Sequence, residues 1–127
     1  MDIGLPIETE VMCFAQNNGI IVSIPFGGHE RYDQIWDING KLLRVQIKKS
    51  SLLDDGSGFQ FAGKNTAGKY TADQVDGIAT IHDGKCYFIP IDQCSNIIRL
   101  RYTIPNNANV KQTKFAYDYE LKRILKI

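Results

Sequence analysis

Three polar residues within residues 31–51, RYDQIWDINGKLLRVQIKKSS, have the chemistry for metal-assisted hydrolysis of a phosphodiester bond. The carboxylate of Asp33 and the amide oxygen of Gln46 are hard ligands that suit Mg²⁺. A cation held by them would polarise a phosphate and lower the pKa of bound water. The ammonium of Lys48 would orient that water and neutralise charge on the phosphoryl group.

A β-hairpin must position these residues. Its predicted strands are residues 32–38 and 42–49, and the dipeptide NG at residues 39–40 supplies the tight turn. Because a two-residue turn fixes the pairing of the strands that it joins, the start of the first strand is expected to lie opposite the end of the second. The hairpin therefore predicts that residues far apart in the chain meet at its open end.

The alternation of side chains along the hairpin predicts one polar face. Successive residues of a strand point to opposite sides. The apolar set Leu43, Val45 and Ile47 is therefore expected to face a core, and the polar set Arg44, Gln46 and Lys48 to face the other way with Asp33. A hairpin with one polar face is also the ordinary form of a solvent-facing sheet, and the spacing alone leaves that interpretation open.

A helix over residues 6–17 offers another carboxylate. Its apolar residues recur at helical spacing: Ile7, Val11, Met12, Phe14 and Ala15. Glu8 falls inside the arc that they define, whereas Glu10 falls off its edge. A carboxylate turned toward the sheet needs a partner, and a cation beside Asp33 would be one. The alternative for both glutamates is a solvated acid of the first turn, favoured by the helix dipole.

The remaining patterns predict a mixed α/β domain built on a central sheet. The further predicted elements are a strand at 19–26, a short strand at 59–62 within a long loop, a second hairpin over 72–91, a strand at 96–103 and a final helix over 115–127. No repeat or linker interrupts them. We therefore expect residues 1–127 to form a single domain.

Composition excludes several classes. The chain is 43% hydrophobic and 23% charged, as is ordinary for a globular protein, and no apolar run is long enough to cross a membrane. Its three cysteines form no CxxC pair, which argues against a structural zinc site and fits the reducing cytoplasm. The net charge of +1 does not by itself announce a nucleic-acid partner.

Local basic and polar residues are nevertheless candidates for contact with a nucleic acid. A glycine-rich loop ahead of Asp33 is able to lie along a phosphate backbone. The candidates are His29 and Arg31 in that loop, Lys49 and Ser50 at the end of the hairpin, and Lys64 and Lys69 in the loop over 52–70. Ordinary surface positions are the alternative for each of them.

The order of these features resembles the PD-(D/E)XK nuclease superfamily. The stretch IPFGGHERYDQIWDINGKLLRVQIKKS carries the likeness, and YTADQVDGIATIHDGKCYFIPI is similar to the later strands of the same proteins. Within the superfamily, the chain looks most like the small endonucleases that include bacterial intron-encoded homing endonucleases, and next like archaeal Holliday-junction resolvases. The resemblance implies a restriction-endonuclease-like core, with a central mixed β-sheet flanked by helices.

The resemblance also implies roles for residues that match the motif. Glu8, Asp33, Gln46 and Lys48 would be the catalytic residues; Glu8, Asp33, Gln46 and Ile47 would hold Mg²⁺, for which Mn²⁺ would substitute. Two positions depart from the usual motif: Tyr32 stands where proline is expected, and Gln46 replaces an acid. An amide is a weaker ligand than a carboxylate, so the site would keep two carboxylates.

These expectations describe a metal-dependent DNA endonuclease, of the homing type, that assembles as a homodimer or homotetramer in order to cut two strands. Three alternatives remain open. They are a resolvase-like nuclease that acts on branched DNA, a nuclease-fold protein that binds nucleic acid without cutting it, and a protein-interaction domain whose polar hairpin face is only solvated.

Overall fold

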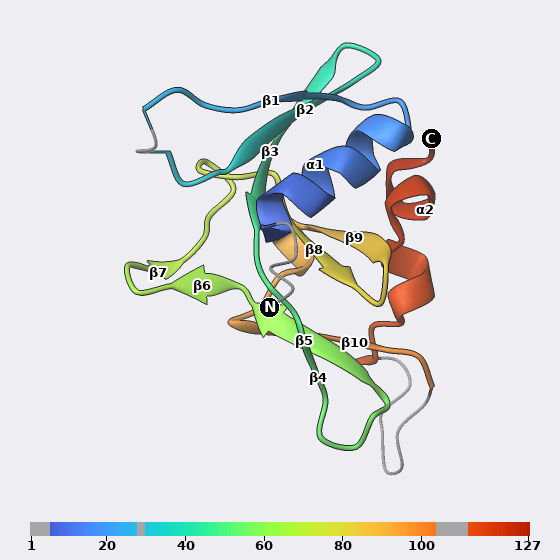
Figure 1. Cartoon of the computed structure of the whole chain (residues 1–127). Coiled ribbons are helices and arrows are strands. Elements are labelled where there is room, and N and C mark those ends of the chain that lie inside the picture. Colours follow the sequence, from blue (N-terminus) through green and yellow to red (C-terminus); the bar gives the residue numbers. More distant parts are fainter. Residues whose placement is uncertain (1–5, 28–29, 104–111) are drawn as a thin grey trace, which may run out of the picture.

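The computed structural model describes residues 6–27, 30–103 and 112–127 (Figure 1). Its helices are α1 (Ile7–Asn17), η1 (Ile91–Gln93), η3 (Ala116–Tyr119) and α2 (Leu121–Leu125), of which η1 and η3 are 3₁₀ helices. The strands of the central sheet are β1 (Ile21–Ser23), β2 (Gln34–Ile38), β3 (Lys41–Ile47), β8 (Gly77–His82) and β9 (Lys85–Pro90). The other strands are β4 (Ser51–Leu52), β5 (Gly58–Ala62), β6 (Lys64–Asn65), β7 (Gly68–Lys69) and β10 (Ile97–Arg101).

The central sheet is mixed, with the order β1-β2-β3-β8-β9. β3 and β8 are parallel, and every other neighbouring pair is antiparallel. Both predicted hairpins are confirmed: Asn39-Gly40 and Asp83-Gly84 each have positive φ at both residues, which is the conformation of a type I′ turn. Because β3 lies at the centre, the residues at its end are supported by strands on both sides.

Helix α1 covers one face of this sheet. Val11 and Ala15 of the helix are fully buried against a cluster that includes Trp36, Val45 and Phe88. Gly77 permits this packing, because a Cβ atom there would lie 2.3 Å from the ring of Phe88. The helix is thereby fixed over β2, β3 and β8, and its first turn lies near the end of β3.

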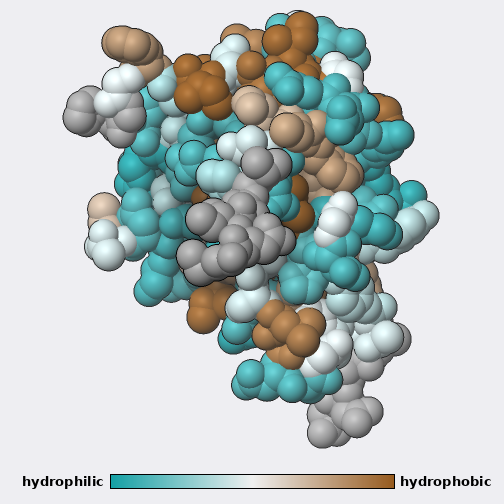
Figure 2. All heavy atoms as spheres, viewed as in Figure 1, coloured by the Kyte–Doolittle hydropathy of each residue, from teal (hydrophilic) through white to brown (hydrophobic). Residues whose placement is uncertain are grey.

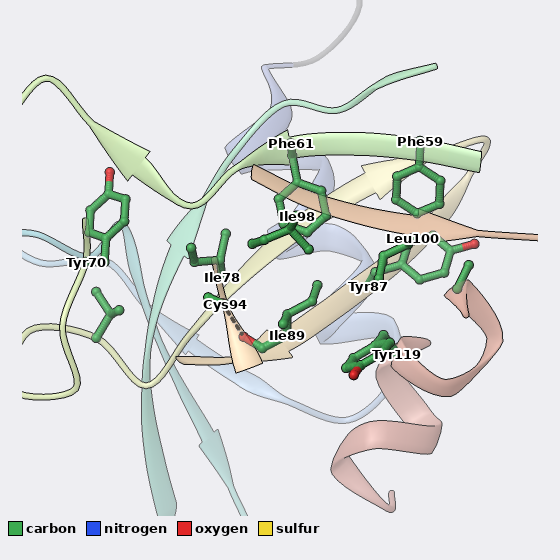
Figure 3. Close-up of a cluster of buried hydrophobic side chains, with 12 residues drawn as sticks. Phe59, Phe61, Tyr70, Ile78, Tyr87, Ile89, Cys94, Ile98, Leu100 and Tyr119 are labelled. Atoms are coloured by element: carbon green, nitrogen blue, oxygen red, sulfur yellow. Dashed lines mark hydrogen bonds between the residues drawn. The ribbon is translucent and has the colours of Figure 1, made fainter. Parts of the chain in front are cut away.

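A second, three-stranded sheet covers the opposite face. Its order is β10-β5-β4, and its inward residues include Phe59 and Leu100. They pack against Ile78 and Ile89 of the central sheet (Figure 3). The α/β class, the central mixed sheet and the flanking helices are therefore as predicted, and a second sheet adds a layer that the sequence did not indicate.

Three segments differ from the prediction. The strand expected at 19–26 is limited to β1, and the loop expected over 52–70 contains the short strands β4, β6 and β7 as well as the predicted β5. The helix expected over 115–127 is divided at Glu120, whose ψ of 140° is extended. Glu120 forms a β-bridge with Tyr87 and an ion pair with Lys85, and these contacts outweigh its helical propensity.

Exposed apolar side chains gather at one end of the molecule, over β1 and the β2–β3 hairpin (Figure 2). Ile21 and Leu42 are each more than 60% exposed there and flank Asp37 in the register of the sheet. No helix among the residues that the structure describes is long and apolar enough to span a bilayer.

Candidate active site

Asp33 joins the open ends of the two hairpin strands. It stands directly before β2, and its backbone N–H donates to the carbonyl of Val45 over 2.8 Å. Its carboxylate oxygen Oδ2 accepts hydrogen bonds from Gln46 Nε2 at 2.8 Å and from the backbone N–H of Ile47 at 2.9 Å. The predicted proximity of Asp33 and Gln46 is therefore observed, and the carboxylate is held in one orientation.

The side chain of Gln46 lies between two oxygens. Besides donating to Asp33, its amide nitrogen Nε2 donates to the carbonyl oxygen of Ile47 over 3.2 Å. A carboxylate oxygen and a carbonyl oxygen thus converge on one amide NH₂ group, whose hydrogens carry positive partial charge. These are hard oxygen donors, and the point where they converge is one that a divalent cation is able to occupy once the amide rotates.

The pKa shifts of the two carboxylates also favour a cation at this position. Burial raises the pKa of Asp33, and the N–H of Ile47 and the positive charge of Lys48 offset this only in part. Burial also raises the pKa of Glu8, and the negative charge of Asp33 raises it further. Each carboxylate is therefore destabilised in its charged form, and a shared cation would relieve both of them.

Glu8 approaches the site from α1, although differently from the expectation. Its side chain is exposed, whereas Glu10, an acid of the same first turn, is partly buried. The backbone of this turn is fixed by Gln34, whose Nε2 donates to the Glu8 carbonyl over 2.7 Å. The side chain is then close enough to Asp33 for the two charges to interact.

Lys48 follows the last residue of β3. Its backbone N–H donates to the carbonyl of Ala79 over 3.0 Å, which continues the pairing of β3 with β8. Its ammonium lies 5.3 Å from the ring centroid of Tyr70 and contributes to the electrostatic field at Asp33. The structure therefore brings Glu8, Asp33, Gln46 and Lys48 to one end of the hairpin.

The donors available here fit a divalent cation. They are the carboxylates of Glu8 and Asp33, the side-chain oxygen of Gln46 and the backbone carbonyl of Ile47, all of them oxygen atoms. Within the described ranges, no group of three or more His, Cys, Asp and Glu side chains lies close enough to bind a metal ion. A site at Asp33 must therefore draw on the amide and the backbone carbonyl as well as on the two acids.

The predicted nucleic-acid contacts fall in several places. Lys64 and Lys69 are exposed and lie directly opposite each other in the two-stranded ribbon of β6 and β7. Arg31 lies over the Tyr70 ring, and Lys49 is exposed. Ser50 donates to the carbonyl of Ile81 over 2.8 Å and lies 3.0 Å from His82 Nδ1, so its hydroxyl is already engaged within the protein. His29 lies outside the described residues.

Two residues beside the site were missed by the sequence analysis. Gln34 is fully buried and accepts a hydrogen bond from Trp36 Nε1 over 3.0 Å, so it links the core to the Glu8 turn. A polar residue on the core-facing side of a strand was the available signal for it. Tyr70 is 3% exposed and contacts both Arg31 and Lys48. Nothing in the local sequence indicated those contacts, since they join distant segments.

A mixed sheet that carries an acid, an amide and a lysine at the end of a central hairpin, beneath a helix that carries a further acid, defines a nuclease of the restriction-endonuclease-like fold. Residues 2–122 match the model of the PD-(D/E)XK endonuclease family, and the chain belongs to this family. Proteins of this kind generally use divalent metals, and their substrate is DNA.

A solved structure of similar fold is a bacterial homing endonuclease, I-Ssp6803I. It is 21% identical to this chain, with a TM-score of 0.69, and the similarity covers 94% of this chain and 85% of the other. This likeness confirms the predicted fold. No curated protein matches the chain.

Proposed function

We propose that this chain is a DNA endonuclease of one domain that depends on Mg²⁺, with Mn²⁺ as a substitute. The family to which the chain belongs and the fold that it shares with a homing endonuclease support the proposal. The observation that carries it is the convergence of Asp33 Oδ2 and the Ile47 carbonyl oxygen on the Gln46 side chain, at 2.8 and 3.2 Å. Lys48 directly follows Ile47, just after the end of β3.

Glu8, Asp33, Gln46 and the Ile47 carbonyl would hold the cation. Gln46 would rotate its side-chain amide so that the oxygen, rather than Nε2, faces the cation beside the Asp33 carboxylate. When bound, a divalent cation supplies positive charge to the scissile phosphate and acidifies water. The ammonium of Lys48 would orient the attacking water by hydrogen bonding and would balance negative charge that grows on the phosphoryl oxygens.

The ribbon of β6 and β7 would contact the DNA backbone. Lys64 and Lys69 are cross-strand partners of like charge, an arrangement that disfavours the ribbon in isolation. A phosphate between them would remove this repulsion. The ribbon projects from the body of the molecule on the side of β3 (Figure 1), and Arg31 donates to the carbonyl of Gly68, beside the turn of the ribbon, over 3.4 Å.

We further propose that the enzyme is of the homing type and acts as a homodimer or homotetramer in the cytoplasm. The homing assignment is supported by the fold of I-Ssp6803I, and the compartment by three unpaired cysteines. Cutting both strands of a duplex at one site requires two active sites, which a symmetric oligomer supplies. Exposed Ile21 and Leu42 give the first strands of the sheet an apolar surface that suits contact with a second copy.

The test is cleavage of plasmid, cruciform and synthetic junction DNA with Mg²⁺ or Mn²⁺. We expect the wild type to cut and Lys48→Ala to lose about 100-fold or more of the single-turnover rate. Lys41→Ala is the matched control, because Lys41 lies in the same strand, is exposed and is remote from Asp33. Absence of cleavage by the wild type, or equal loss in both variants, would contradict the proposal.

The substrates also separate the alternatives within the same experiment. Cutting of a duplex at one sequence supports a homing enzyme, whereas cutting of branched DNA regardless of sequence supports a resolvase. Salt-dependent DNA binding without cutting would indicate a protein that has kept the fold and lost catalysis.

A further inference from the structure

Tyr70 brings together two cations from distant segments of the chain. The guanidinium carbon of Arg31 lies 4.5 Å from its ring centroid, and the ammonium nitrogen of Lys48 lies 5.3 Å from it. Both distances are within the range of cation–π attraction, which is electrostatic and directs a cation to the face of an aromatic ring. One buried ring thus contacts the proposed catalytic lysine and a proposed phosphate ligand.

The ring itself is fixed by the core. Tyr70 is 3% exposed and belongs to the cluster between the two sheets, where it lies at the margin, apart from Phe59 and Tyr119 (Figure 3). It directly follows β7, so the ribbon of β6 and β7 leads into it. A side chain in this position connects the ribbon to the end of β3.

The two cations have few partners other than the ring. Among the residues that the structure describes, the Lys48 ammonium makes no hydrogen bond and no ion pair within 4 Å, and Arg31 Nε is buried without a hydrogen-bond partner. Within the described part of the chain, Arg31 is otherwise held only by its contacts with Gly68 and the ring. An aromatic face restricts where a cation lies without consuming its N–H donors, which stay free for a phosphate or a water.

We infer that Tyr70 is a positioning residue of the active site, which holds Lys48 and Arg31 beside the scissile phosphate through its aromatic face. The inference rests on the proposed function, because it concerns the same site. A long lysine side chain has several rotatable bonds and would otherwise sample positions away from Asp33. A displacement of about 1 Å at a catalytic group lowers the rate by about 100-fold. A residue that fixes the position of the ammonium therefore contributes to the rate.

Three variants separate this role from simple packing. Tyr70→Phe keeps the aromatic face, whereas Tyr70→Leu removes it and retains apolar volume. Phe61→Leu is the matched control, because Phe61 is 4% exposed in the same cluster and contacts neither cation. All three are first compared by thermal unfolding, so that activities are measured on folded protein.

Activity is measured as single-turnover cleavage at saturating protein, together with DNA affinity. We expect Tyr70→Phe to cut within about threefold of the wild type, and Tyr70→Leu to cut about 10- to 100-fold more slowly with a smaller change in affinity. Phe61→Leu should lose stability as Tyr70→Leu does while keeping its rate. Equal rates in Tyr70→Leu and the wild type, or equal losses in Tyr70→Phe and Tyr70→Leu, would overturn the inference.

A second readout does not depend on cleavage. In the NMR spectrum, the ε-methylene protons of Lys48, assigned with Lys48→Arg, should lie upfield of their value in an unstructured peptide because of the Tyr70 ring. The shift should persist in Tyr70→Phe and Phe61→Leu and disappear in Tyr70→Leu. An unshifted Lys48 in the wild type would overturn the inference even if Tyr70→Leu fails to fold. A shifted Lys48 in a protein that cuts no DNA would instead reject the proposed function and leave the contact standing.

Discussion

The side-chain amide of Gln46 donates its hydrogen bond to the Asp33 carboxylate over 2.8 Å, so a neutral amide stands beside the acid that we propose as a metal ligand. In the absence of a cation this pairing stabilises the buried charge of Asp33. In the proposed metal site, the same amide would turn its oxygen toward the cation. Gln46 would therefore serve the metal-free and the metal-bound states in different ways, and its replacement separates them.

Gln46→Glu should lower the stability of the metal-free protein and tighten metal binding. The glutamate cannot donate to Asp33 and adds a second negative charge beside it, at a cost of about 1–3 kcal/mol in the free energy of unfolding. The added charge should lower the Kd for Mn²⁺ by about tenfold. Urea unfolding with a chelator and calorimetric titration with Mn²⁺ measure the two effects. Gln60→Glu on β5 is the control, and equal behaviour of both variants would contradict this account of Gln46.

Gln34→Leu should destabilise the fold and weaken metal binding together. The substitution leaves the indole N–H of Trp36 and the Glu8 carbonyl without their partner, and Trp36 is fully buried. An unsatisfied buried donor costs about 1–3 kcal/mol. Because Trp36→Phe removes the same hydrogen bond, the two substitutions combined should cost less than their sum in urea unfolding. Strict additivity would show that the bond contributes little.

The Arg44–Asp76 pair should contribute stability that depends on pH. Burial would raise the pKa of Asp76, but hydrogen bonds from the Arg44 side chain and backbone outweigh it and lower the pKa below its ordinary value of 3.8. A carboxyl group with a lowered folded pKa stabilises the fold above the unfolded pKa, and this contribution is lost as the pH falls through the folded value.

Asp76→Asn should therefore cost about 1 kcal/mol at pH 7, and the difference from the wild type should shrink as the pH is lowered below about 4. Urea unfolding at both pH values measures it. Asp92→Asn, at an exposed acid, is the control. A difference that grows in acid would contradict the assigned direction.

Only one thiol of the folded protein should react with Ellman's reagent. Cys13 is exposed, whereas Cys86 and Cys94 are buried, and burial raises the pKa of each buried thiol to about 12. A thiol in that range is almost wholly protonated at pH 8 and is a poor nucleophile. Addition of a denaturant should release all three. Loss of the fast-reacting thiol in Cys13→Ala, and not in Cys86→Ala, completes the assignment.

The parts of the fold that follow from local rules were predictable from the sequence. The NG turn and the alternation along β3 placed Asp33 and Gln46 together, the DG turn located the second hairpin, and helical spacing located α1. The rest depends on contacts between distant segments. Glu120 leaves the helical conformation because it pairs with Tyr87, and Tyr70 meets Arg31 and Lys48 through the tertiary fold. Periodicity carries no information about such contacts.

The exposure of Glu8 illustrates the same point at the site. The helical arc placed Glu8 on the side of α1 that faces the sheet, but this residue lies in the first turn, where the sheet ends. Its side chain is therefore exposed while its charge still interacts with that of Asp33. The angle of a residue around a helix indicates which way its side chain points. It does not indicate where the sheet that packs against the helix ends.

Crystals of the protein soaked with Mn²⁺ test the central claim most directly, by the anomalous scattering of the ion. We predict one peak about 2.0 to 2.6 Å from a carboxylate oxygen of Asp33 and from the carbonyl oxygen of Ile47. The peak should be absent in Asp33→Asn and present in Asp37→Asn, since Asp37 lies in β2, which Asp33 directly precedes, and on the same face of the sheet. A peak elsewhere, or one that persists in Asp33→Asn, would contradict the proposed site.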